Sequence, residues 1–291
     1  MPYPGRKSVC TEVEAFCADN GLTVDQFYGR EEYEGILLLD VPEIPERIGE
    51  TLHRFHNIRS ATLQDVSADG SLYVTTRFAD TQQLHRVSRP GGARRQLTFL
   101  PEPVQDVKRR PGDDDFLVFL MDRGGDEHYQ VYGFDPAVGE ERRLTDGRGR
   151  HGSLLWSPTG DRLAFSSTRR NDRSIDLWVG PGDDLDRAEM VFEAPNYAYW
   201  APAAWSPDGR RLALLEYRSI TDQRTHILDL DSGELQTPVP GPGVTVLDPL
   251  AFADDDSSLF VRTDSGGEHY RLARFHLGSG VMESIVEEPW D

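Results

Sequence analysis

The segment Trp205-Ser206-Pro207-Asp208-Gly209-Arg210-Arg211-Leu212-Ala213-Leu214-Leu215 contains every signal of a β-hairpin. Pro207 presets φ for the second position of a type I turn, and Asp208 tolerates the third. Gly209 can take the positive φ that closes a three-residue hairpin with a bulge. Residues 212–215 then have the composition of a buried strand. The segment therefore predicts a strand, a tight turn and a second, buried strand.

The same pattern recurs along the chain. Residues 156–165 repeat it as Trp-Ser-Pro-Thr-Gly-Asp-Arg-Leu-Ala-Phe, and residues 66–74 repeat it more weakly. The turn glycines are Gly70, Gly112, Gly160 and Gly209, with spacings of 42, 48 and 49 residues, and an acidic turn at Asp255 follows after 46 more. A repeat of this length is typical of a four-stranded propeller blade.

Each repeat has the same internal order: a short inner strand, the turn, an apolar second strand, a third strand and an outer strand. The apolar strands are expected at residues 72–76, 116–121, 163–167, 212–217 and 259–263. The third strands are expected at residues 83–87, 129–134, 175–179, 226–230 and 270–275. Two outer strands, 94–98 and 141–145, are nearly identical and lie 47 residues apart, which supports this register.

The predicted fold class is all-β: a β-propeller of four-stranded antiparallel blades, about five in number and forming an incomplete ring, with short N-terminal helices. Residues 1–56 are predicted as an N-terminal helical extension and residues 57–291 as the propeller. The blades are expected at about 57–98, 99–146, 147–194, 195–239 and 240–288.

Two helices are predicted in the extension. Thr11 and Glu14 form a capping box for a helix over residues 12–19. A second helix starts at Pro45, and its apolar residues recur at helical spacing. These residues are Ile44, Ile48, Leu52 and Phe55. We expect this extension to pack beside the first blade.

An open arc of five blades would leave one face of each terminal blade without a neighbour. On the fifth blade we expect Leu259, Phe260 and Val261 to lie on that exposed face. Large exposed apolar patches are unusual on soluble monomers, so self-association through the open blade faces is expected.

Composition excludes some classes of partner. The chain has 291 residues and a formal net charge of −19, which disfavours binding to nucleic acid and to anionic membranes. Cationic or neutral peptides are compatible with this charge. Cys10 and Cys17 make no disulfide framework, and the chain has neither an export signal nor an apolar run of membrane-spanning length. We therefore expect a cytoplasmic protein.

Several motifs that can carry chemistry are better interpreted as structure. Residues 147–152 match the G-x-G-x-x-G pattern, but they precede another hairpin instead of opening a helix, so a loop between blades is favoured over a dinucleotide site. The acidic runs 113–115 and 254–256 occupy hairpin turns and lack the ligand spacing of a calcium loop. Trp156, Trp178 and Trp205 are expected in the core. No cofactor and no metal site are predicted.

Two similar loops are the candidate partner-facing sites. Residues 122–129 and 264–270 each join a second strand to a third strand and share a Gly-Gly pair followed by Glu-His-Tyr. A hairpin whose acidic side chains bind their own backbone is the simpler interpretation. The functional alternative places six polar side chains on a rim that meets a partner. They are Asp122, Glu127, His128, Asp264, Glu268 and His269.

No residue is predicted to be catalytic. A serine hydrolase of the α/β type needs a nucleophile in a G-x-S-x-G elbow, and the chain has no such pentapeptide. Residues 278–280, Gly-Ser-Gly, come nearest, but they lie in a predicted hairpin.

The hairpin motif at residues 205–213 resembles the PD40, or TolB-type, WD40-like repeat. More specific resemblances lie in residues 57–61, 76–87, 90–98 and 121–129. Together they are similar to the N-terminal propeller of S9 peptidases, the prolyl oligopeptidase and acylaminoacyl-peptidase group, over about residues 40–291.

The resemblance implies a propeller that gates access of peptide substrates to an α/β-hydrolase domain, which these residues do not include. It supplies no catalytic residue for this chain, so whether the chain is part of an enzyme stays open. The alternative is a stand-alone TolB-like propeller that binds a protein or peptide. A lactonase-type propeller would need Glu, Asn and Asp around an axial metal, and no such set is identified.

Overall fold

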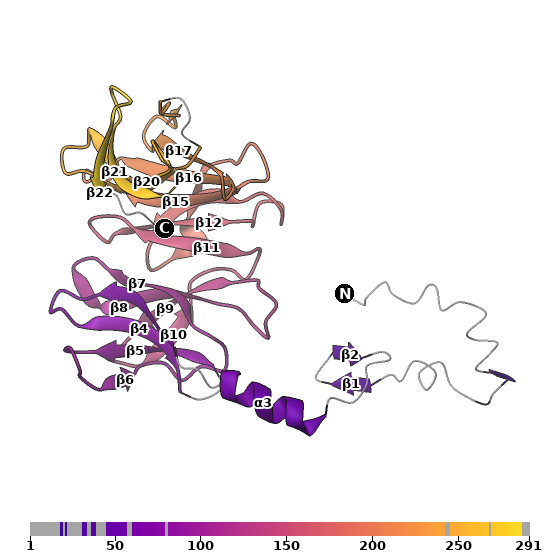
Figure 1. Cartoon of the computed structure of the whole chain (residues 1–291). Coiled ribbons are helices and arrows are strands. Elements are labelled where there is room, and N and C mark those ends of the chain that lie inside the picture. Colours follow the sequence, from indigo (N-terminus) through magenta and orange to yellow (C-terminus); the bar gives the residue numbers. More distant parts are fainter. Residues whose placement is uncertain are drawn as a thin grey trace. The chain divides into compact units, whose positions relative to one another are not determined.

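The computed structural model describes residues 18, 19, 21, 31–33, 36–38, 45–56, 60–78, 81–241, 245–267 and 269–286 (Figure 1). The chain divides into two compact units, Met1–Ile58 and Arg59–Asp291. No helix within the described ranges is long and apolar enough to cross a membrane.

The N-terminal unit contains a hairpin and a helix. Strands β1 (Glu31–Tyr33) and β2 (Ile36–Leu38) pair antiparallel, and α3 spans Glu46–His56. The predicted second helix is therefore confirmed, while the one expected at residues 12–19 lies almost entirely outside the described residues. The hairpin corrects the purely helical prediction for this region. Strands of three residues are too short to show the alternation that identifies a strand in a sequence.

The second unit is built from five antiparallel four-stranded sheets, each with its strands in chain order. Blade one consists of β3 (Ala61–Val66), β4 (Leu72–Arg77), β5 (Gln82–Val87) and β6 (Arg94–Gln96). Blade two consists of β7 (Gln105–Arg110), β8 (Asp113–Met121), β9 (Gln130–Asp135) and β10 (Glu140–Arg143). Blade three consists of β11 (His151–Trp156), β12 (Arg162–Ser167), β13 (Asp176–Pro181) and β14 (Glu189–Phe192), with the short 3-10 helix η1 (Leu185–Arg187) before β14.

The last two blades have the same construction. Blade four consists of β15 (Tyr199–Trp205), β16 (Arg211–Ser219), β17 (Asp222–Asp229) and β18 (Leu235–Gln236). Blade five consists of β19 (Leu247–Phe252), β20 (Ser258–Thr263), β21 (Arg271–His276) and β22 (Met282–Val286). Inner strands contact in the order β3, β7, β11, β15 and β19. The predicted fold class, an incomplete propeller of five antiparallel blades, is confirmed.

The turn that defines the repeat has the expected conformation. Gly209 has φ of +71°, and its N–H donates to the carbonyl of Ser206 at 2.9 Å. The Ser206 hydroxyl donates to the Asp208 carboxylate at 2.6 Å and accepts the backbone N–H of Arg211 at 2.8 Å. The serine and aspartate of the motif therefore hold the hairpin closed, and the glycine supplies a conformation that other residues rarely adopt.

Adjacent blades are linked by arginines that bind the next turn. Arg110 Nε donates to the Gly160 carbonyl at 2.6 Å, and Arg162 Nη2 donates to the Gly209 carbonyl at 2.6 Å. Between blades four and five, Arg211 Nη2 donates to the Asp256 carbonyl at 3.0 Å. The same arginines lie over the aromatic ring that ends the next inner strand, as Arg162 does over Trp205 at 4.8 Å.

The tryptophans of the motif also connect neighbouring blades. Trp205 Nε1 donates to the Leu155 carbonyl of blade three at 3.2 Å, and Trp156 Nε1 donates to the Lys108 carbonyl of blade two at 3.4 Å. Both indole rings are buried, as predicted, whereas Trp178 is half-buried. Each tryptophan thus fixes one inner strand against the preceding one.

The hydrophobic core consists of layers between consecutive blades. Between blades one and two, Tyr73 and Leu84 pack with Leu117 and Phe119, all fully buried. The layers between later blades follow the same rule. Blades two, three and four therefore each supply apolar side chains from both faces of the sheet, as neighbour-stacked repeats require.

The structure corrects the expectation for the open face of blade five. Leu259 and Val261 are fully buried in the layer with blade four, and Phe260 is half-buried. The register pairs Phe260 with Arg274, so the opposite face of the sheet carries arginine. Arg262 pairs with Asp248 at 2.9 Å and Arg274 with Asp255 at 3.2 Å. The prediction placed three consecutive residues on one face, whereas strand alternation puts Leu259 and Val261 toward blade four and Phe260 on the opposite face.

Candidate functional site

A cavity of about 750 Å³ lies where blades two and three meet, and Tyr199 of blade four completes its wall. It is formed by the loops that follow the second strands and by the first residues of the inner strands. Its main polar lining residues are Asp106, His128, Arg150, His151, Ser153, Asp172 and Arg173. Leu120, Tyr129, Ile175 and Tyr199 add apolar and aromatic surface. This size and mixed lining are typical of a small-ligand site.

Bulges in two inner strands shape one wall of this cavity. Asp106 and Ser153 have φ of +47° and +53°, and the strand register shifts at both places. The Asp106 carboxylate accepts the Leu154 N–H at 3.1 Å and pairs with Lys108 at 3.0 Å. The Ser153 hydroxyl and the Tyr199 hydroxyl are 2.5 Å apart. Positive φ at residues other than glycine is costly and concentrates at functional sites.

His151 is the buried polar group of the site. Its side chain lies at the start of β11 and is only 2% exposed, and neither ring nitrogen makes a well-formed hydrogen bond, since the backbone of Arg148 is only a weak partner. Burial, with a contribution from the charge of Arg169, lowers the pKa of His151 to about 4. The ring is therefore neutral at pH 7 and has one N–H donor and one acceptor nitrogen available. Buried polar groups without partners are uncommon and call for an explanation.

Two arginines bring positive charge to the cavity. Arg150 Nη1 lies 3.7 Å from the Glu127 carboxylate in a pair that is more than half exposed on both sides, and its guanidinium lies 5.5 Å from the centre of the Tyr129 ring. Arg173 lies 4.8 Å from the centre of the Tyr197 ring. Exposed pairs of this length contribute little stability, so the Arg150 guanidinium can change partners easily.

The predicted partner-facing residues of blade two divide between structure and cavity. Asp122 is buried, and its carboxylate accepts the Glu127 N–H at 3.0 Å within the same loop. His128 lines the cavity, and Glu127 holds Arg150 at its edge. The structure therefore brings Glu127 and His128 to one site and uses Asp122 to hold their loop.

The corresponding residues of blade five lie elsewhere. Asp264 accepts the backbone N–H groups of Thr245 and Val246 at 3.1 and 3.0 Å, which anchors the start of the inner strand. His269 lies in the loop before β21, and Glu268 lies outside the described residues. Because two blades separate this loop from blade two in the stacking order, the six predicted residues do not form one cluster.

Sequence reasoning missed Arg150, His151, Arg173 and Tyr199. The first two belong to the segment 147–152, which covers the end of the connection from β10 and the first two residues of β11, and in which Gly149 has φ of +67° and packs against the backbone of Arg169. The sequence signal that could have identified them is the run of arginine and histidine at residues 148–151. No pattern in the sequence could bring residues 150 and 199 together.

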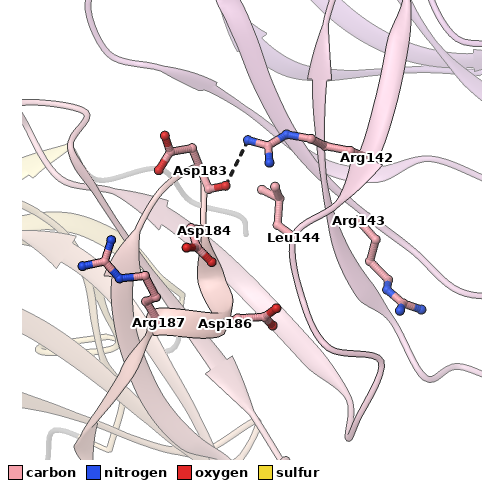
Figure 2. Close-up of a pocket in the computed structure, with 7 residues that line it drawn as sticks. All are labelled: Arg142, Arg143, Leu144, Asp183, Asp184, Asp186 and Arg187. Carbon is pink, nitrogen blue, oxygen red and sulfur yellow. Dashed lines mark hydrogen bonds between the residues drawn. The ribbon is translucent and has the colours of Figure 1, made fainter.

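A second hollow, of about 430 Å³, lies at the outer edge between the same two blades (Figure 2). Arg142 Nη2 donates to the Asp183 carbonyl at 3.0 Å across it. Asp184, Asp186 and Arg187 come from the η1 segment, and Asp186 points toward the side of Arg143 and Leu144 whereas Arg187 points away from them. This open and evenly charged notch offers no group that distinguishes one ligand from another.

The polar side chains of the cavity are suited to binding. The Ser153 hydroxyl of the cavity hydrogen-bonds to the Tyr199 hydroxyl. No group of three or more histidine, cysteine, aspartate and glutamate side chains in the described part of the chain is placed to hold a metal ion. Arginine, neutral histidine and tyrosine are suited to binding an anionic or polar ligand.

The fold and its repeats define a β-propeller, and known proteins with a similar fold include TolB and prolyl oligopeptidase. No family model matches the chain. Protease 2 from Moraxella lacunata is 26% identical over 177 residues, which cover 59% of this chain and 25% of that protein. Prolyl oligopeptidase B from Galerina marginata has the same fold with a TM-score of 0.62 at 13% identity, covering 84% of this chain and 39% of that one.

TolB from Acinetobacter baumannii also shares the fold. Its TM-score is 0.54 at 13% identity, and the match covers 88% of this chain and 63% of that one. The resemblance to both groups of propeller is thus confirmed at the level of the fold. The chain spans about a quarter of the length of Protease 2.

Proposed function

We propose that this chain is the non-catalytic, substrate-gating propeller portion of an S9 prolyl-oligopeptidase-family serine peptidase. Peptide hydrolysis would require a C-terminal α/β-hydrolase domain. The observation that carries this proposal is the similarity to Protease 2, because it joins the propeller fold to a relative whose name states proteolysis. Its partners would be that hydrolase domain and short peptides, and its location the cytoplasm.

The cavity between blades two and three supports a role in holding peptides. It combines aromatic walls with arginine and neutral histidine, which suit the mixed surface of an unfolded peptide. A rigid frame of blades around such a site would admit short chains and exclude folded proteins.

A stand-alone TolB-like propeller is the second candidate. The match to TolB from Acinetobacter baumannii covers 88% of this chain with a TM-score of 0.54, so its fold supports this candidate as well. Such a propeller would bind a protein or peptide and leave it intact.

Size selectivity tests the two candidates. The purified chain is titrated into a fluorescein-labelled octapeptide and, separately, into a folded carrier protein that displays the same eight residues in a loop. Gating predicts that anisotropy rises for the free peptide only. Binding of the folded carrier as tightly as the peptide would favour the TolB-like function, and binding of neither would refute both.

A further inference from the structure

We propose that the cavity between blades two and three is a carboxylate-binding subsite, in which Arg150 and Arg173 hold the C-terminal carboxylate of a short peptide. This inference rests on the proposed function, because it takes the ligand to be a peptide. It adds which end of the peptide binds, and where.

The charge at the cavity is the first reason. In a chain with a net charge of −19, carboxylates outnumber basic side chains, so an arginine has many potential partners. Among the described residues, however, Arg173 makes no ion pair and contacts the ring of Tyr197, and Arg150 reaches Glu127 only at 3.7 Å. Two guanidinium groups at one cavity without tight partners can receive a carboxylate bidentately.

The acidic groups of the lining leave this positive charge in place. Asp106 is paired with Lys108 at 3.0 Å and also accepts a backbone N–H, so its carboxylate is already engaged. Asp172 is the other lining carboxylate, and it is exposed. The cavity thus has two available guanidinium groups against one solvated carboxylate.

His151 is the second, independent reason. Its side chain is 98% buried at the cavity wall and neither nitrogen makes a well-formed hydrogen bond, since the backbone of Arg148 is only a weak partner, although burying a polar group without a full hydrogen bond is unfavourable. Both nitrogens are covered by the side chains of the wall, so a ligand carbonyl or carboxylate oxygen that displaced this cover would accept the N–H. Because the ring is neutral, its hydrogen bond to the ligand would add no charge to those of the two arginines.

Size and aromatic surface match the end of a peptide. A cavity of about 750 Å³ lies in the range of small-ligand sites and has room for two or three residues. Tyr129 and Tyr199 provide flat surfaces for the side chains that precede the carboxylate. A C-terminal carboxylate has peptide chain on one side only, so it can enter the cavity together with its own residue. A charged side chain within the peptide has chain on both sides and cannot do so.

The test compares three N-terminally labelled hexapeptides by fluorescence anisotropy: a free acid, the same sequence with a C-terminal amide, and the amide with one internal glutamate. We expect the free acid to bind about tenfold more tightly than the amide, which corresponds to about 1.4 kcal/mol. The internal glutamate should restore less than half of this preference. Raising the NaCl concentration should reduce it.

Arg173→Gln and Arg150→Gln should each bring the free acid and the amide to within about threefold of each other. Arg123→Gln is the matched control, because Arg123 is an exposed arginine of the blade two loop that does not line the cavity and the change in net charge is the same. Melting temperatures of the variants check the fold.

Each remaining outcome decides the question. Equal binding of acid and amide to the wild-type chain overturns the carboxylate subsite and leaves the proposed function standing. Binding of none of the peptides overturns both. Displacement of the free acid by inorganic phosphate at lower concentration than by acetate would assign the site to phosphate and overturn the inference. An unchanged preference for the free acid over the amide in both Arg150→Gln and Arg173→Gln would also overturn the inference.

Discussion

Replacement of Gly209 by valine tests both the turn and the link between blades. Gly209 has φ of +71°, and a β-branched residue there costs roughly 1 to 3 kcal/mol. A Cβ atom would lie 3.2 Å from Arg162 Nη2, whose hydrogen bond to the Gly209 carbonyl would be disturbed at a further cost of about 1 kcal/mol. The free energy of unfolding should fall by about 2 to 4 kcal/mol, which lowers Tm by about 4 to 16 °C in a unit of this size.

Two glycines serve as controls in the same calorimetric experiment. Gly278 has no positive φ and no atom close to its added Cβ, so Gly278→Val should cost less than about 1 kcal/mol. Gly70 has φ of +80° in open space, so Gly70→Val measures the backbone strain alone. Equal shifts for Gly209→Val and Gly278→Val would refute the turn assignment. Equal shifts for Gly209→Val and Gly70→Val would leave no role for the Arg162 contact.

Four further results are expected. Arg162→Ala should lower the free energy of unfolding by about 1 kcal/mol, and Arg162→Lys should recover less than half, because lysine lacks the planar fork; full recovery in urea titrations would contradict the link. Between pH 6.5 and 4 the unfolded chain protonates His151 while the folded chain does not, so stability falls on acidification by up to about 3 kcal/mol. A pH profile of His151→Phe that matches the wild type would disprove this. A serine-directed phosphonate should label no serine of the purified chain, and stoichiometric labelling would show otherwise. Blade one exposes Leu63 and Phe78, so a hydrophobic dye should bind and Leu63→Glu should weaken it, whereas a compact monomer without dye binding would exclude an open apolar face.

The repeat could be predicted from sequence because its signals are local. Ser206, Asp208 and Gly209 lie within four residues of one another and hydrogen-bond within one turn. Five copies at nearly constant spacing therefore gave the number of blades and the positions of their strands. The helix Glu46–His56 was equally predictable, since Pro45 and the apolar spacing both lie in the chain itself.

The tertiary structure alone decided what the blades present to each other and to a ligand. Arg162 and Gly209 are 47 residues apart, and their contact depends on how one blade stacks on the next. The same stacking buried Leu259 and Val261, and it brought Arg150, His151 and Tyr199 to one cavity from two blades. A strand's alternation is set by its own residues, whereas the partner of each face is set by the twist and order of the sheets around it. The sequence thus determined the repeat, and the packing of the blades determined the site.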